Sequence, residues 1–465
     1  EGWKKLKKLR AARNDNRAFS FDVLMANPPF AGDIKQSDML SPYELGHKAN
    51  GKLETKVGRD LLFIERNLDF LATPARDVPL RQRSLRAAFE HSWRLLDDEE
   101  RAILPALAVF AGGFTRQAAE EVAGASLMAL AGLMAKSLVE RTGEGRYDLH
   151  EIVRQYAAEK LAEAGDAAAA HERHWRYCLH LAQEADAARN SPQHMELVDQ
   201  LVAESDNMQA ALERLLAHDV AEAWRLAGVM EAYWYRRPVR ESLRWLNRLV
   251  AAGEQAGDPA APGVRARVLL ILATFQPNLV ETMKRLHAVL ALARAGEERR
   301  ITAVVLAMLG NEGIITGEFG QSDAYFDEAL ALAKAAGDKA TLSTVLAERG
   351  ESERYQGRYD RATELYTESL ALAQAIGRTD LTAGILSALA KLALRQGDPQ
   401  RARAVIAPTV PVWEALNDRV GLGTAQLAGA RAATMEGQYD EALAILDGAE
   451  AIFHDTGYRA NDQFF

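Results

Sequence analysis

The sequence predicts a mainly α-helical protein: an α-solenoid of paired helices, preceded by a winged-helix domain and by a truncated α/β segment. Three observations lead to this fold class. Gly317, Gly357, Gly397 and Gly437 recur at one constant interval in the C-terminal half (357−317, 397−357 and 437−397 are equal). Amphipathic helices followed by a short hairpin occupy the region before them. Near the N-terminus, an apolar run of strand length ends at two prolines.

The glycine period predicts one pair of antiparallel helices in each interval. A second set of turn residues falls halfway between the first: Gly337, Gly377, Asn417 and Gly457. Glycine favours these turns because it adopts the left-handed conformation at which a helix ends. The period extends backwards, so we expect about six copies from roughly residue 220 to residue 457.

Residue types recur inside the period as well. The best-matched copy, which resembles a tetratricopeptide repeat, holds Gly350, Gly357, Tyr359, Ala362, Tyr366 and Leu370. Because the usual period of that family is shorter, about 34 residues, the resemblance implies helices that are longer by up to about a turn each. Extended repeats of this kind are typical of the sensor arms of large bacterial signalling ATPases.

A polar stripe is expected on the concave side of the repeats. Moving one period at a time from the position after Gly350 gives Asn311, Glu351, Lys391 and Arg431, and Arg354 and Arg395 lie nearby in the sequence. The stripe is mixed in sign and becomes basic toward the C-terminus. Such a groove suits a protein, a peptide or a small-molecule inducer. Ordinary solvated positions explain the pattern equally well, and no ligand is selected by the sequence.

Residues 81–165 predict the winged-helix domain. Acids open a helix after Asp97, Thr115 is the expected N-cap of the next one, and a hairpin turns at Gly143-Glu-Gly145 before a helix that starts at Glu151. The segment 117–123 is the candidate recognition helix. It carries two acids and no base, so we do not expect this domain to read DNA.

Four segments of this domain resemble the winged helix of bacterial STAND regulators, signal-transduction ATPases in which a nucleotide domain precedes a winged helix and helical repeats. The segments are 85–93, 109–115, 136–138 and 149–157. The resemblance implies that His150 corresponds to a histidine that senses the β-phosphate of bound ADP. Since the nucleotide domain is missing from the N-terminal side, we expect His150 to be a vestige or a plain wing residue.

The helical connector is predicted over residues 166–219. An aromatic cluster follows it and is expected to pack in the core: Trp224, Tyr233, Trp234 and Tyr235. Histidines early in this region are unevenly spaced: His171, His174, His180 and His194. We expect them on solvated helix faces, and no metal site is predicted.

The segment 1–71 has a different character. An apolar run over 19–26 stops at Asn27, Pro28, Pro29 and Phe30. This motif resembles that of the adenine-N6 DNA methyltransferases of restriction-modification systems. The resemblance implies that Asn27 and the Pro28 carbonyl hold the amine of a flipped adenine and that Phe30 stacks on the base. The donor would be S-adenosylmethionine, but residues 1–18 supply no loop for it, so we expect a vestigial segment and no cofactor for this chain alone.

Composition sets further bounds. The chain has 465 residues, 48% of them hydrophobic, and a net charge of −9, which argues against nucleic acid as the main ligand. No apolar run approaches membrane length, so we expect no membrane partner. Cys178 is the single cysteine, which fits a reducing, cytoplasmic location. The absence of an initiator methionine favours a fragment of a longer chain.

The expected organisation is therefore a methyltransferase-like segment (1–71), a linker (72–80), the winged helix (81–165), the connector (166–219) and the repeats (220–465). We interpret the chain as an interaction or ligand-sensing module of a STAND-type regulator. The competing interpretation is an adenine-specific DNA methyltransferase that acts only with a complementing chain, and only then would DNA be the partner. A third possibility is a fused or misassembled reading frame at residues 71–74.

Overall fold

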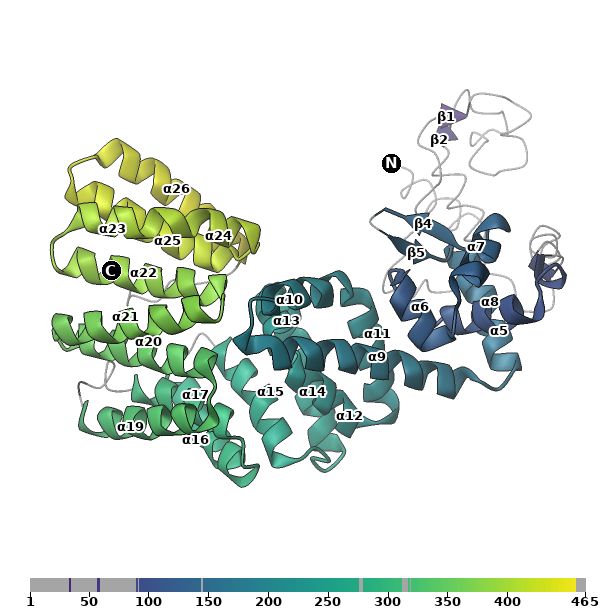
Figure 1. The fold of residues 1–465 in the computed structure, drawn as a ribbon, viewed down its shortest axis with the longest axis horizontal. Helices are drawn as coiled ribbons and strands as arrows, with labels where there is room; N and C mark the ends of the chain where they lie inside the picture. Colours follow the sequence, from purple (N-terminus) through teal and green to yellow (C-terminus); the bar gives the residue numbers. More distant parts are fainter. Residues whose placement is uncertain are drawn as a thin grey trace, which may run out of the picture. The chain divides into compact units, whose positions relative to one another are not determined.

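The structure of the chain is a computed structural model that describes residues 33–34, 57–58, 89–90, 92–143, 145–275, 279–311, 317 and 319–456. The chain divides into two compact units, Glu1–Asp97 and Asp98–Phe465. In the first unit, β1 (Asp33–Ile34) pairs antiparallel with β2 (Val57–Gly58). The motif at Asn27–Phe30 lies outside the described residues. The second unit holds the winged helix, the connector and the repeats (Figure 1).

The winged helix combines helices with a small sheet. Its helices include α5 (Asp98–Leu107), α6 (Arg116–Ala123), α7 (Leu127–Ala135) and α8 (Glu151–Glu163). Its strands are β3 (Phe114–Thr115), β4 (Glu140–Thr142) and β5 (Arg146–Asp148), in the antiparallel order β3-β5-β4. The predicted hairpin and the helix that follows it are therefore confirmed.

Side-chain caps explain where the central helices of this domain begin. The Thr115 hydroxyl accepts a hydrogen bond from the Ala118 amide at 3.1 Å, as predicted, and the Ser126 hydroxyl accepts one from the Ala129 amide at 3.1 Å. Gly124 ends α6 with a φ of 68°. In the core of this domain, the Phe110 and Phe114 rings are buried with their centroids 4.9 Å apart.

The prediction of the recognition helix is wrong. The helices α6 and α7 meet at 104° across a short turn, which is the geometry of a helix-turn-helix, and the second helix of that motif is α7. Our candidate segment lies in α6, which also begins one residue earlier, at Arg116. The sequence of α7 contains no charged residue, and it exposes Leu127 and Met128, with 81% of Met128 accessible.

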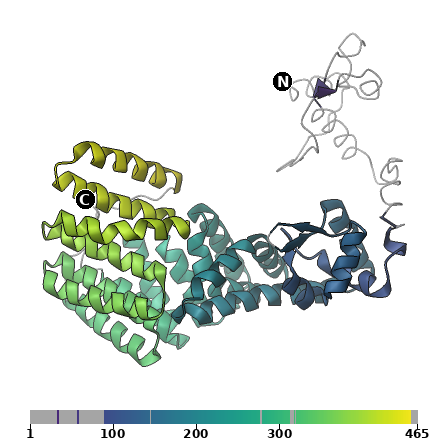
Figure 2. The ribbon, with the colours of Figure 1, turned by 45° about the horizontal axis from the view of Figure 1, so that its top comes forward.

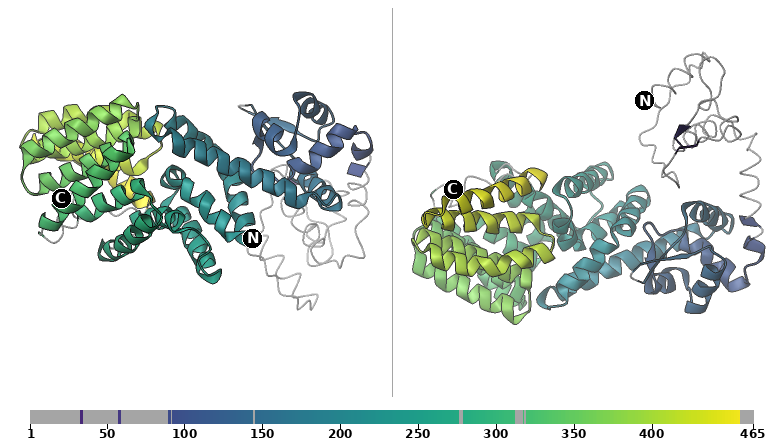
Figure 3. Two further views of the ribbon diagram at one scale, coloured as in Figure 1. Left: turned by 60° about the horizontal axis from the view of Figure 1, so that its bottom comes forward. Right: turned by 90° about the horizontal axis from the view of Figure 1, so that it is seen from above.

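The connector begins with α9 (Ala167–Ala187), which Figure 3 shows as a long helix leaving the winged helix. The short helix η2 (Ala188–Asn190) follows it, and then come α10 (His194–Ala203) and α11 (Ser205–His218). We also count α12 (Val220–Val229) and α13 (Glu231–Arg236) with the connector, beyond the bound at residue 219, because they precede the regular helix pairs.

Two of the histidines expected on solvated faces are buried instead. Only 2% of His174 and 6% of His194 is exposed, because each ring has a hydrogen-bond partner in the interior. His174 Nε2 lies 3.2 Å from Asn207 Oδ1, and His194 Nδ1 lies 2.8 Å from the Ala185 carbonyl oxygen. Trp224, Tyr233 and Trp234 pack in the core as predicted, whereas Tyr235 is 46% exposed.

The repeats are stacked pairs of antiparallel helices, seen from another side in Figure 2. The helix α14 (Val239–Gln255) precedes the pairs α15 (Pro262–Thr274) with α16 (Leu279–Ala295), α17 (Arg299–Gly310) with α19 (Phe319–Ala336), and α20 (Lys339–Tyr355) with α21 (Tyr359–Ala375). Next, α22 (Thr379–Arg395) pairs with α23 (Pro399–Ile406), η3 (Ala407–Thr409) and α24 (Val410–Ala415), and α25 (Arg419–Met435) pairs with α26 (Tyr439–Thr456).

The regular grid of turns is confirmed by backbone angles. Left-handed φ values occur at Gly317, Gly337, Gly357, Gly377, Gly397 and Gly437. Two non-glycine residues at grid positions adopt the same left-handed conformation: Asn417 has a φ of 50° and Glu297 has a φ of 54°. Helix termination by a left-handed residue thus recurs even where the glycine is lost.

Size complementarity explains how the paired helices interlock. A Cβ atom on Gly350 would lie 2.8 Å from the Tyr366 ring, and one on Gly310 would lie 2.7 Å from the Phe326 ring. One period after Gly350 and Tyr366, the same two positions hold Ala390 and Ile406. An aromatic residue therefore faces glycine and an aliphatic residue faces alanine, which keeps the packed volume of each crossing similar.

The tip of the connector contacts the repeats. Asn190 Oδ1 accepts a hydrogen bond from the Ala340 amide at 2.8 Å, at the start of α20. The Arg189 carbonyl oxygen accepts one from Arg378 Nη1 at 2.9 Å, just before α22. These two bonds form what we call the connector brace, because they tie two successive repeats to one short segment that lies far from them in the sequence.

Across the described part of the chain, no single helix is both long and apolar enough to cross a bilayer. The pair α6 and α7 meets that criterion only when the two are counted together across their 104° bend.

Candidate functional site

Three residues of the predicted polar stripe, Asn311, Glu351 and Arg354, take part in a chain of contacts along α17, α20 and α21. Asn311, at the end of α17, donates through Nδ2 to Glu348 Oε2 at 2.5 Å. One turn further along α20, Glu351 accepts two hydrogen bonds from Arg354, at 3.0 and 2.6 Å. The Tyr366 hydroxyl of α21 also donates to Glu351, at 2.6 Å.

Charges along this stripe are unevenly compensated. Burial alone would raise the pKa of Glu351, but hydrogen bonds from Arg354 and its positive charge outweigh that effect and lower the pKa. Burial raises the pKa of Glu348, because its amide partner Asn311 brings no charge. Burial also lowers the pKa of the Lys391 ammonium group. Two neighbouring carboxyl groups on α20 are therefore shifted in opposite directions, the pKa of Glu351 downward and that of Glu348 upward.

Four basic members of the predicted stripe lie around one small depression. Arg354 comes from α20, Lys391 and Arg395 from α22, and Arg431 from α25, and together they line a hollow of about 40 Å³. Arg354 is paired with Glu351. Within the part of the chain that the structure describes, no hydrogen bond or ion pair engages Arg395 or Arg431. We call these four residues the basic cluster.

A second, larger hollow lies between the connector and the repeats. It has a volume of about 460 Å³ and is walled by α9, α10 and α13 on the connector side and by α17, α20 and α22 on the repeat side. Neither its position nor its residues were predicted from the sequence. Its apolar wall includes Met195, Val198, Leu201, Val304, Leu381 and Leu416.

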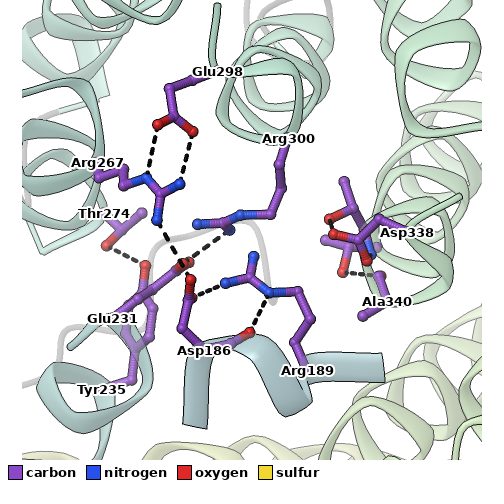
Figure 4. A network of polar contacts seen from close by, with 12 residues as sticks. Asp186, Arg189, Glu231, Tyr235, Arg267, Thr274, Glu298, Arg300, Asp338 and Ala340 are labelled. Atoms are coloured by element: carbon purple, nitrogen blue, oxygen red, sulfur yellow. Dashed lines mark hydrogen bonds and ion pairs between the residues drawn. The ribbon is translucent and has the colours of Figure 1, made fainter. Parts of the chain in front are cut away.

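Ion pairs at one end of this cavity link the connector to α15 and α17 (Figure 4). Arg267 binds Glu298 with two hydrogen bonds, at 3.2 and 2.9 Å, and reaches Asp186 of α9 at 3.4 Å. Arg300 pairs with Glu231 at 2.9 Å. Burial would raise the pKa of Glu231, but the arginines around it, Arg300 first among them, lower it below its usual value.

The connector brace forms the other end of the cavity. Arg378 holds Asp380 through two hydrogen bonds, at 2.7 and 2.6 Å, in addition to its bond to the Arg189 carbonyl oxygen. The nearby His194 ring is neutral at physiological pH, because burial and the positive charge of Arg378 lower its pKa to about 4. The arginine side chains at this end are thus engaged by carboxylate or carbonyl groups.

The winged helix is joined to the connector by a buried polar cluster. Asn207 of α11 accepts from the Ala111 amide at 2.8 Å and donates to the Gly113 carbonyl oxygen at 2.9 Å and to Glu204 at 2.6 Å. Arg146 of the wing forms an ion pair with Glu204. Burial lowers the pKa of His174, which contacts the same asparagine, to about 4. We call this set of contacts the winged-helix junction.

His150, predicted as a vestigial nucleotide sensor, is the N-cap residue of α8. Its Nδ1 atom accepts a hydrogen bond from the Ile152 amide at 3.4 Å, and its side chain is exposed. Capping explains a polar residue at this position without a nucleotide.

The methyltransferase-like residues Asn27, Pro28, Pro29 and Phe30 lie outside the described residues. Among the residues that the structure describes, no group of three or more His, Cys, Asp or Glu side chains could hold a metal ion.

The sequence predicted the stripe but neither the cavity nor the junction. The stripe was predicted because Asn311, Glu351, Lys391 and Arg431 repeat with the period of the glycines. On the repeat side several cavity residues lie one repeat period apart, such as Arg300 with Ala340 and Thr341 with Leu381. The connector residues that complete the cavity have no such counterpart, and Asp186 and Arg267 look like ordinary charges on amphipathic helices. The sequence held one signal for the junction: Asn207 is a polar residue next to apolar residues of its helix, and the structure shows that Asn207 is fully buried.

Two family models match this chain. A tetratricopeptide-repeat model matches residues 341–407, and a winged helix-turn-helix model matches residues 96–162. The protein is thus a mainly α-helical chain with a winged helix and tetratricopeptide-like repeats.

Curated relatives match part of the chain. It is 36% identical over 215 residues to provisionally named HTH-type transcriptional regulators of Mycobacterium bovis and Mycobacterium tuberculosis, a match that covers 43% of this chain and 24% of the relatives. The chain therefore spans about a quarter of their length. It is also 38% identical over 165 residues to an uncharacterized protein of Mycobacterium tuberculosis, covering 33% of this chain and 37% of that one.

Solved structures resemble the fold only loosely. A STAND protein with a tetratricopeptide-repeat sensor from Pyrococcus horikoshii is 16% identical with a TM-score of 0.35, covering 84% of this chain and 68% of that one. A Rap protein complexed with competence and sporulation factor is 14% identical with a TM-score of 0.48, covering 66% and 85% of the two chains. With TM-scores below 0.5, neither likeness supports an argument about function.

Proposed function

We propose that this chain is the partner-sensing part of a STAND-type transcriptional regulator and that its repeats bind an acidic segment of a protein or peptide. The observation that carries the proposal is the basic cluster. Three successive repeats contribute Arg354, Lys391, Arg395 and Arg431 to one depression, where Arg354 is paired with Glu351. The winged helix match and the partial identity to HTH-type regulators support the regulatory context.

Electrostatics favours an acidic partner at this place. Burial lowers the pKa of Lys391 because the charged ammonium group has lost water, and a carboxylate from a partner would favour its charged form. Arg395 and Arg431 can each form a bidentate pair with a carboxylate. The stripe also presents Glu351 and Asn311, which can accept backbone amide groups of an extended peptide.

The winged helix is proposed to act in this context by contact with protein rather than by reading bases. The second helix of its helix-turn-helix, α7, carries no lysine or arginine to neutralise phosphate, and it exposes Leu127 and Met128. The winged-helix junction fastens this domain to the connector, so that a change in the repeats can reach it through buried contacts.

Selection of peptides from a random library against the full chain tests the proposal. We expect enriched peptides to be rich in Asp and Glu and to bind about tenfold more weakly to the variant Arg395→Glu/Arg431→Glu, measured by fluorescence anisotropy. The control is Arg361→Glu, an exposed arginine on α21 whose partner is Glu364. Peptides that show no acidic bias, or that bind the double variant and the wild type alike, would contradict the proposal.

The methyltransferase interpretation remains as a second proposal, based on the motif Asn27–Phe30. Under it, the chain transfers a methyl group from S-adenosylmethionine to adenine N6 once a second chain supplies the cofactor site. Isothermal titration calorimetry of the isolated chain with S-adenosylmethionine tests this second proposal in one direction. Micromolar binding would favour the enzyme, whereas the absence of heat agrees with both proposals.

A further inference from the structure

The cavity between the connector and the repeats has the dimensions of a small-molecule site. Its volume of about 460 Å³ falls within the usual range for ligand pockets, roughly 300–1,000 Å³. Apolar side chains form much of its wall, and they come from the connector (Met195, Val198, Leu201) and from the repeats (Val304, Leu381, Leu416). An apolar body would therefore be enclosed by both parts of the chain.

Two arginines that line the cavity have unused hydrogen-bond donors. Arg300 pairs with Glu231 at 2.9 Å and Arg236 pairs with Asp199 at 2.8 Å. In each case the other terminal nitrogen, Nη2 of Arg300 and Nη1 of Arg236, is buried and has no hydrogen-bond partner in the described chain. A buried donor without an acceptor costs about 1–3 kcal/mol, which an acceptor on a ligand would recover.

The charge balance of the cavity limits the head group of such a ligand. Asp186, Glu231 and Asp380 already engage Arg189, Arg300 and Arg378. A doubly charged phosphate would lie close to these carboxylates, and like charges would repel it. A single negative charge is what the remaining donors can accept.

We propose that this cavity binds a small molecule with one carboxylate group and an apolar body, held by Arg300 and Arg236 and by the apolar wall. Because its walls belong to both the connector and the repeats, the bound molecule strengthens the contact between them. This site is separate from the basic cluster and does not depend on the protein or peptide proposed for it.

Calorimetric titration of the full chain with simple probes tests the chemistry. We expect octanoate or indole-3-acetate to bind with a Kd of about 0.1 mM, and octanol, octylamine and octyl phosphate to bind at least about tenfold more weakly. Tighter binding of octyl phosphate than of octanoate would overturn the single-charge argument. Absence of binding by both carboxylates at about 5 mM would overturn the site.

Two variants test whether octanoate binds in the cavity. Arg300→Met/Glu231→Gln removes the ion pair without leaving a buried charge, and Ala232→Phe fills the space from α13. Both are expected to weaken octanoate binding about tenfold or more, while octanol binding changes only in the second. A control, Arg294→Met, removes an exposed ion pair with Glu328 outside the cavity. Unchanged octanoate binding in either cavity variant would overturn the proposal.

Thermal melts without ligand show whether each variant is folded, so that a loss of binding is read only from folded protein. The basic-cluster variant Arg395→Glu/Arg431→Glu is expected to keep full octanoate affinity. Loss of peptide binding alone in that variant, and loss of octanoate binding alone in Arg300→Met/Glu231→Gln, would keep the two proposals distinct. Loss of octanoate binding in the basic-cluster variant would count against a separate site.

Discussion

The repeats and the winged-helix junction are stabilised by different interactions. In the repeats, helices interlock by size, as where Gly350 accommodates the Tyr366 ring, only 16 positions further along the chain (366−350). At the junction, buried Asn207 joins α11 to the Ala111 amide, 96 positions away. Interactions of the first kind recur with the repeat and leave a period in the sequence. Those of the second kind occur once and leave none.

The largest expected effect comes from breaking the junction with Asn207→Ala. This change removes the partner of the Ala111 amide, the Gly113 carbonyl oxygen and Glu204, all in a buried setting, so we expect the local free energy of opening to fall by about 3 kcal/mol. The rate of hydrogen exchange at the Ala111 amide measures this free energy of opening. The control Asn247→Ala changes an exposed asparagine on α14 and should leave that exchange rate unaltered. Equal protection in both variants would refute the role of Asn207.

A smaller effect is expected from breaking one size match with Gly350→Ala. The added methyl group would lie 2.8 Å from the Tyr366 ring, so we expect a loss of about 1–3 kcal/mol. Gly429→Ala is the matched control, since no atom lies within 4 Å of its added Cβ, and it should gain up to about 1 kcal/mol from helix propensity. Gly350→Ala/Tyr366→Ile recreates the pairing of the next repeat and should recover part of the loss. Thermal melts compare the three, and equal destabilisation by both single alanines would contradict the size rule.

The last test measures how the stability of the junction depends on pH, where the effect per pH unit is small. The pKa of His174 in the folded chain is about 4, below the usual value near 6.5, so the unfolded chain binds protons more readily between these values. The stability that His174 contributes should be complete above pH 6.5 and be lost at roughly 1 kcal/mol per pH unit between 6.5 and 4, in addition to a similar loss from His194. His174→Gln should show a shallower loss over this window. His180→Gln, at an exposed position on the same helix, should follow the wild type, and a shared profile for all three proteins would contradict the assignment.

Prediction from sequence succeeded where the physical cause was local. The turn grid, the hairpin and the Thr115 cap each depend on residues within a few positions of one another. It failed for His174 and His194, because their burial depends on partners in other segments, and for the recognition helix, because only the crossing of α6 and α7 shows which helix is second. The stripe was found through its period, whereas the cavity required the connector and the repeats to be placed together.

The connector brace has a consequence for how the chain folds. In a simple solenoid each repeat contacts only its neighbours, so that copies can unfold one after another from an end. Here the bonds of Asn190 and Arg189 join positions 150 and 189 residues apart in the sequence. Closing such long loops slows folding, and opening α20 or α22 requires the release of the η2 tip. We therefore expect the segment from α9 to α22 to unfold as one cooperative block, whereas the described helices after α22 keep the freedom to fray separately.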